Sequence, residues 1–169
     1  MAALTTLGII HTAISLVAVG SGIVSLVRHG DISLRNGVGK TYVVTTILTC
    51  LTGFGIFQHG GFGAPHMLGI ITLVVLGIAY AGGKKRFGKA SAYVETICYT
   101  MTFFFHFIPA VNETTTRLPV NAPLASGPED PLVQKLVGIC FLLFLVGVTL
   151  QVIRLRSRSK LAGDGGVAA

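Results

Sequence analysis

The chain has 169 residues, of which 51% are hydrophobic and only 11% are charged, and its mean hydropathy is +0.76. A soluble domain of this length needs more charge to cover its surface, so the composition indicates an integral membrane protein with a single helical domain. The net charge of +7 and the pI near 9.7 do not indicate a nucleic-acid partner. Basic residues of membrane proteins gather in loops for topological reasons.

Five apolar stretches can form helices that cross a membrane, and they fall at residues 4–27, 41–58, 66–82, 92–111 and 132–153. A hydrocarbon core of about 30 Å needs roughly 20 helical residues, so the second and third stretches are short. Helices are expected because backbone polar groups must be satisfied internally within a bilayer. We therefore predict an all-α integral membrane bundle over residues 1–160, followed by a disordered tail at 161–169.

The basic residues predict the orientation of this bundle. Most of the 13 Lys and Arg residues lie between the first and second stretches, between the third and fourth, or after the fifth. The positive-inside rule then places the N-terminus outside and the C-terminus in the cytoplasm. The loop at 112–131 falls on the outer side, and its prolines predict a non-helical segment. Both a structured cap and a flexible connector remain open for it.

Three stretches carry patterns of small or polar residues. The first places His11, Ser15, Ala18, Gly22 and Ser25 on one helical face, which favours close helix packing. The second places Thr45, Thr52 and His59 at intervals of two turns. The fifth has few polar residues before Gln151, and is therefore expected to be the most exposed to lipid.

The fourth stretch carries the clearest polar pattern. Glu95, Tyr99, Thr102 and His106 follow one another at helical spacing and share one face of an otherwise apolar helix. Polar side chains in a membrane-spanning helix usually face the interior of the bundle. The spacing therefore predicts an internal polar track.

The predicted topology gathers four of the five histidines in the outer half of the bundle. His11 and His106 lie within the membrane and could hold a haem as axial ligands. His59 and His66 lie at the outer interface and could bind a transition metal ion, with Glu113 as an oxygen ligand. The leading hypothesis is a histidine-based haem or metal site that serves electron transfer.

Two alternatives stand beside the redox hypothesis. The track from Glu95 to His106 could relay protons or a solute, which would make the protein a small transporter or proton conductor. The protein could also be an accessory subunit of a membrane complex. The partners considered are the lipid bilayer, a quinone that docks on an interfacial histidine, a membrane-complex partner and a second copy of the chain. No pattern decides whether the protein is an enzyme.

An early in-span histidine, His11, is followed by a short basic loop and by a Gly-Lys-x-Tyr entry into the second stretch, at Gly39, Lys40 and Tyr42. This pattern resembles small bacterial predicted polytopic membrane proteins of unknown function, over residues 8–82. Those proteins tend to carry a histidine before the glycine, where this chain has Arg35 or Asn36. The resemblance implies a bacterial inner membrane and supplies no activity.

Overall fold

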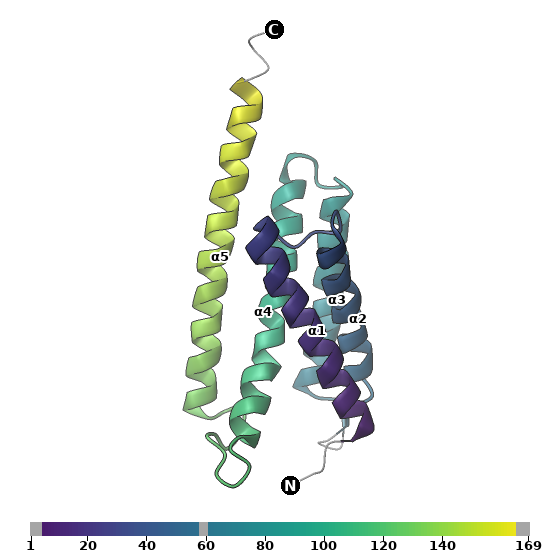
Figure 1. The fold of residues 1–169 in the computed structure, drawn as a ribbon, viewed down its shortest axis with the longest axis vertical. Helices are drawn as coiled ribbons and strands as arrows, with labels where there is room; N and C mark the ends of the chain where they lie inside the picture. Colours follow the sequence, from purple (N-terminus) through teal and green to yellow (C-terminus); the bar gives the residue numbers. More distant parts are fainter. Residues whose placement is uncertain (1–4, 58–60, 165–169) are drawn as a thin grey trace.

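The computed structural model describes residues 5–57 and 61–164, with side chains described as far as Ser159. Over these residues the fold is all-helical and has no strand. The elements are α1 (Thr6–His29), α2 (Gly37–Gly53), α3 (Ala64–Gly83), the 3₁₀ helix η1 (Gly88–Ala90), α4 (Ser91–Arg117) and α5 (Pro131–Asp164). Helices α1 to α4 form a bundle, and α5 lies along one side of it (Figure 1).

Four helical segments are long and apolar enough to cross a membrane: α1, α3, η1 together with α4, and α5 to Ser159. Helix α2 has 17 residues and is the shortest of the five long helices. The described side chains are also distributed as in a membrane protein. Large apolar residues are exposed, such as Leu16 at 66% and Val27 at 80%, whereas Thr46 and Thr102 are fully buried at 0%. An apolar exterior around a polar interior suits a lipid environment.

Local sequence explains where the first helices begin and end. Thr5 caps α1, because its hydroxyl accepts a hydrogen bond from the backbone N–H of Gly8. Gly30 ends α1 with a left-handed φ of 77°, which glycine adopts without steric cost. Asn36 then caps α2 by accepting from the N–H of Gly39 at 2.8 Å.

Several boundaries differ from the sequence-based expectation. Helix α2 begins at Gly37 rather than residue 41, because of the Asn36 cap, and it ends at Gly53 rather than residue 58. Helix α4 continues to Arg117, so the first part of the loop expected at 112–131 is helical. The prolines of that loop begin only at Pro119, after the helix has ended.

The remaining loop between α4 and α5 is folded against the end of α4. The N–H of Ala125 donates to the carbonyl of Thr115 at 3.0 Å, and Ala125 is buried. Asp130 accepts from the N–H groups of Ser126 and Leu132, which fixes the start of α5. At its other end α5 is helical to Asp164. The helix therefore extends into the tail that was expected to be disordered from residue 161. Residues 165–169 lie outside the described part of the chain.

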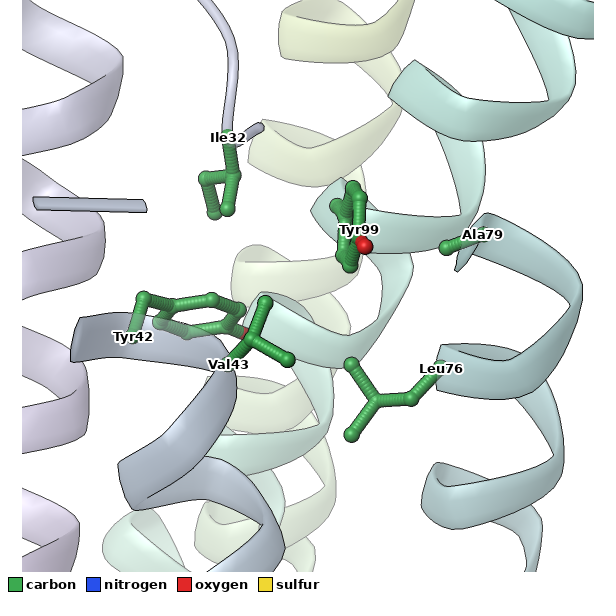
Figure 2. Close-up of a cluster of buried hydrophobic side chains, with 6 residues drawn as sticks. All are labelled: Ile32, Tyr42, Val43, Leu76, Ala79 and Tyr99. Carbon is green, nitrogen blue, oxygen red and sulfur yellow. The ribbon is translucent and has the colours of Figure 1, made fainter. Parts of the chain in front are cut away.

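The helices alternate in direction, so the three basic segments lie at one end of the molecule (Figure 1). We call this the basic end and define it by residues 28–40, 84–89 and 154–158. The other end, formed by the end of α2, the start of α3 and the loop 118–130, is called the opposite end. The largest described cluster of buried apolar side chains lies toward the basic end of α1 to α4 (Figure 2).

Candidate functional site

Glu95, on the first turns of α4, is paired with an arginine from the loop between α1 and α2. Nη1 of Arg35 donates to Oε2 of Glu95 at 2.7 Å and to Oε1 at 3.0 Å. The hydroxyl of Ser33 also donates to Oε1, at 3.2 Å. The Glu95 side chain is only 7% exposed, whereas that of Arg35 is 64% exposed. A buried carboxylate is thus neutralised by a charge that reaches it from the basic end.

The surroundings of Arg35 hold its charge in place. Burial opposes the charged form and is the largest single influence, but the hydrogen bond to Glu95 and the negative charges of Glu95 and Asp31 together outweigh it and raise the pKa of the Arg35 guanidinium above its ordinary value. Asp31 adds a second ion pair, with 3.5 Å between its carboxylate and Nη2 of Arg35. We call Asp31, Ser33, Arg35 and Glu95 the ionic group.

Two glycines make room for the ionic group. A side chain on Gly39 would meet the carbonyl oxygen of Ser33, so only glycine allows the loop to lie on α2. A Cβ on Gly82 would lie 2.8 Å from the backbone nitrogen of Glu95. Helices α3 and α4 therefore approach each other closely beside the carboxylate.

Farther along α4, two side-chain hydrogen bonds join it to α2. The Tyr42 hydroxyl lies 2.9 Å from Oγ1 of Thr102, and Oγ1 of Thr46 lies 3.1 Å from Nε2 of His106. Thr102 donates its proton to the carbonyl of Tyr99, so Tyr42 is the donor to Thr102. The rings of Tyr42 and His106 also meet edge to face, with centroids 6.0 Å apart. We call Tyr42, Thr46, Thr102 and His106 the central group.

Tyr99 and apolar side chains separate the ionic group from the central group. Tyr99 lies one turn from Glu95 on α4 and is 1% exposed. Ile32, Val43, Leu76 and Ala79 surround it from the α1–α2 loop, α2 and α3 (Figure 2). Every member of the polar face expected on α4, from Glu95 to His106, is therefore buried, and the interior between its two polar groups is closed by apolar packing.

His11 and His66 have separate surroundings. Nδ1 of His11 lies 3.0 Å from Oγ1 of Thr52, which joins α1 to α2. Nδ1 of His66 accepts from the N–H of Gly63 at 3.2 Å, and its ring is stacked between Phe57 and Phe62. Nε2 of His66 is buried and has no hydrogen-bond partner among the residues that the structure describes.

The structure does not gather a metal-binding set from the residues it describes: no group of three or more His, Cys, Asp or Glu side chains could hold a metal ion there. His59, expected to act with His66, lies outside the described residues. Glu113, expected as an oxygen ligand, is paired with Arg117 one turn away on α4. The expected axial ligands of a haem, His11 and His106, each have a threonine of α2 as hydrogen-bond partner.

Sequence reasoning missed the partners of the polar face. Arg35 lies in the basic segment between the first and second stretches, and nothing in the sequence marked it as the counter-ion of Glu95. The spacing of Thr45, Thr52 and His59 predicted no buried face on α2, where Thr46 and Thr49 are the buried threonines. The signal that could have found this face is the helical spacing of its buried residues, Gly39, Tyr42, Val43, Thr46, Thr49 and Cys50.

The face expected on α1 is correct toward the basic end. Ala18, Gly22 and Ser25 are buried, and a Cβ on Gly22 would lie 2.6 Å from the Phe103 ring of α4. Small residues thus bring α1 against α4, as in other membrane helix pairs.

No known protein family, curated protein or solved structure matches this chain.

Proposed function

We propose that the protein conducts protons across a membrane through the interior of α1 to α4. In this proposal all five long helices cross the bilayer of a bacterial inner membrane, the N-terminus lies outside and the basic end lies in the cytoplasm. The grouping of the basic segments at one end supports this orientation. The observation that carries the function is the buried polar face of α4, which runs from Glu95 to His106.

The energetic cost of this face argues for a function. On insertion scales a charged side chain at the centre of a membrane-spanning helix costs about 2.5–3.5 kcal/mol, and the cost is lower near a helix end, where Glu95 lies. Ionisable residues within membrane-spanning helices mark ion or proton pathways. Threonine and tyrosine hydroxyls can hold helices together without any charge. A packing role therefore accounts for Tyr42 and Thr102, but it gives no reason for a buried carboxylate and a buried histidine on the same face.

The order of the groups suits a proton better than a hydrated ion. Glu95 would exchange protons with the cytoplasm beside the exposed Arg35. Tyr99 follows one turn along α4, and its backbone carbonyl accepts from the hydroxyl of Thr102. That hydroxyl contacts the Tyr42 hydroxyl, and the Tyr42 ring lies beside His106. In this proposal the Tyr99 hydroxyl would carry the proton across the apolar packing between the ionic group and the central group. The apolar side chains around Tyr99 offer no ligands to a metal cation. A proton can instead be passed between hydroxyl, carboxylate and imidazole groups.

Proton flux into liposomes tests the proposal directly. Purified protein is reconstituted with a trapped pH-sensitive dye, and a potassium gradient with valinomycin supplies the driving force. We expect the wild type to acidify the lumen well above the rate of empty liposomes. Glu95→Gln removes the carboxylate and should lower the rate at least tenfold. His106→Gln should also lower it.

Glu113→Gln is the matched control, because it makes the same chemical change on the same helix at a side chain that is 52% exposed. Its rate should stay within twofold of the wild type. If wild-type liposomes conduct no faster than empty ones, or if Glu95→Gln and Glu113→Gln behave alike, the proposal is wrong. The polar face would then be structural, as expected for an accessory subunit of a membrane complex.

Haem binding by His11 and His106 is a second candidate. It is favoured by one observation: both rings contact threonines of the same helix, α2, inside the bundle. Protein expressed with ample haem should then show a Soret band that is lost in His11→Ala and in His106→Ala. A colourless protein would rule out this candidate and leave the proton proposal untouched.

A further inference from the structure

A cavity of about 440 Å³ opens between α4, α5 and the basic end of α1. This volume lies within the range of about 300–1,000 Å³ that is typical of small-molecule sites. Helix α5 packs along α4, and at the basic end it also approaches the end of α1 (Figure 1). The cavity therefore follows the seam between two helices that are expected to face lipid.

The walls of the cavity are apolar over most of its length. Phe103, Phe104 and Phe107 contribute from α4, and Leu143 and Phe144 face them from α5. Gly147 also lines the cavity, and a Cβ there would meet no atom within 4 Å. Such walls fit a hydrocarbon chain.

Polar groups line the basic end of the cavity. Gln151 accepts from Thr100 at 2.9 Å and donates to the carbonyl of Gly30 at 3.0 Å, so its amide is already engaged. Arg154 lies against Gly30, where a side chain would collide with the guanidinium, and donates to the carbonyl of His29 at 3.3 Å. Gly30 thus lets Arg154 cover the end of the cavity.

The charge of Arg154 is not compensated within the described part of the chain. No carboxylate there lies within ion-pair distance of Arg154 or of Arg158, which lies one turn farther along α5. Asp31 borders a small pocket next to both arginines, but its carboxylate is paired with Arg35. Arg154 thus lines both the apolar cavity and the small pocket beside it, and Arg158 lines the small pocket. This pair of positive charges next to apolar walls fits an anion attached to a hydrocarbon chain.

We propose that this cavity binds an anionic phospholipid. The phosphate lies on Arg154 and Arg158, and one acyl chain runs along Phe103, Phe104 and Phe107 toward the opposite end. Basic pockets between membrane helices bind anionic headgroups in this way, and arginine suits phosphate because its donors form a planar fork. The proposal requires only that the basic end lies at a headgroup layer, and it is independent of proton conduction.

Native mass spectrometry of the detergent-solubilised protein tests this inference. Dioleoyl phosphatidylglycerol and dioleoyl phosphatidylcholine, which have the same acyl chains, are added in equal amounts. We expect one tightly bound lipid per chain and at least a fivefold preference for the anionic one. Arg154→Ala should remove most of this preference. Arg158→Ala, which leaves the contact between Arg154 and His29 intact, should reduce it at least twofold.

Two matched controls separate the cavity from the general surface of α5. Arg156→Ala removes the same charge from the same helix at a residue that lines neither the cavity nor the small pocket beside it, and should leave the preference unchanged. Gly147→Phe fills the cavity and should abolish binding of both lipids. Gly138→Phe also enters open space on α5, but outside the lining, and should have no effect.

Three results would overturn the proposal. Equal binding of the two lipids would show a crevice filled by any lipid, and equal effects of Arg154→Ala and Arg156→Ala would show that only the total charge matters. A wild-type dimer that Gly147→Phe converts to a monomer would show that the cavity receives a second copy of the chain instead.

Discussion

In the α1–α4 bundle most buried side chains are polar, and they hydrogen-bond to backbone groups or to one another, whereas α5 packs aromatic rings against α4. Phe104 of α4 packs against both Phe141 and Phe144 of α5, with each ring centroid 5.6 Å from its own, and the two rings of α5 also contact each other. Among the described residues of α5, only Val133 and Gln151 are buried. Lipid tails are as apolar as leucine, so burying apolar surface adds little to helix association in a bilayer. The packing of α1 to α4 therefore depends on hydrogen bonds and close helix contacts, whereas the position of α5 depends on a narrow strip of contacts with α4.

This comparison predicts the largest loss of stability where α3 and α4 approach most closely. Gly82→Val places a side chain against the backbone of Glu95, and overpacking of this kind costs about 1–3 kcal/mol or more. Gly77→Val, on the same helix, meets no atom within 4 Å and should change stability little. Thermal unfolding in detergent, followed by a thiol-reactive dye that reports exposure of the buried Cys50, measures both. Equal melting temperatures would mean that α3 and α4 are not packed at this point.

The next largest effect is expected at the ion pair. Arg35→Ala leaves the carboxylate of Glu95 buried without its counter-ion. Breaking a fully buried pair costs about 3–5 kcal/mol, but Arg35 is itself largely exposed, so we expect about 2 kcal/mol. Arg35→Ala combined with Glu95→Gln removes the charge as well, and should recover part of the loss in the same unfolding assay. A double variant less stable than Arg35→Ala would contradict this reading of the pair.

The smallest effect is expected at α5. Phe104→Ala removes the ring that packs against Phe141 and Phe144 and should cost about 1 kcal/mol, from lost aromatic contacts rather than from the hydrophobic effect. Leu142→Ala, at a residue 61% exposed on α5, should be neutral. Hydrogen exchange should show the loss as faster exchange confined to α5. Faster exchange throughout α1 to α4 would mean that α5 supports the whole bundle.

Much of the polar face on α4 could be predicted from the sequence, because the helical period alone decides which residues share a face. Glu95, Tyr99, Thr102 and His106 are all buried as that period indicates. The same reasoning did not identify the buried threonines of α2, where apolar, glycine and threonine residues surround the whole helix and several faces look alike. Periodicity identifies a face only when its residues differ clearly from those around it.

The sequence by itself determined that the chain is helical and that α1, α3, α4 and α5 are long and apolar enough to cross a membrane, because composition and hydropathy depend on no partner. Only the tertiary structure decided which groups meet. Gly39 lets the α1–α2 loop, which carries Arg35, lie close on α2, and Arg35 reaches Glu95 from there. Gly82 lets α3 approach α4 beside Glu95. Arg154 lies at the end of the cavity because Gly30 leaves room for it. These contacts join residues far apart in the chain, and no local pattern encodes them.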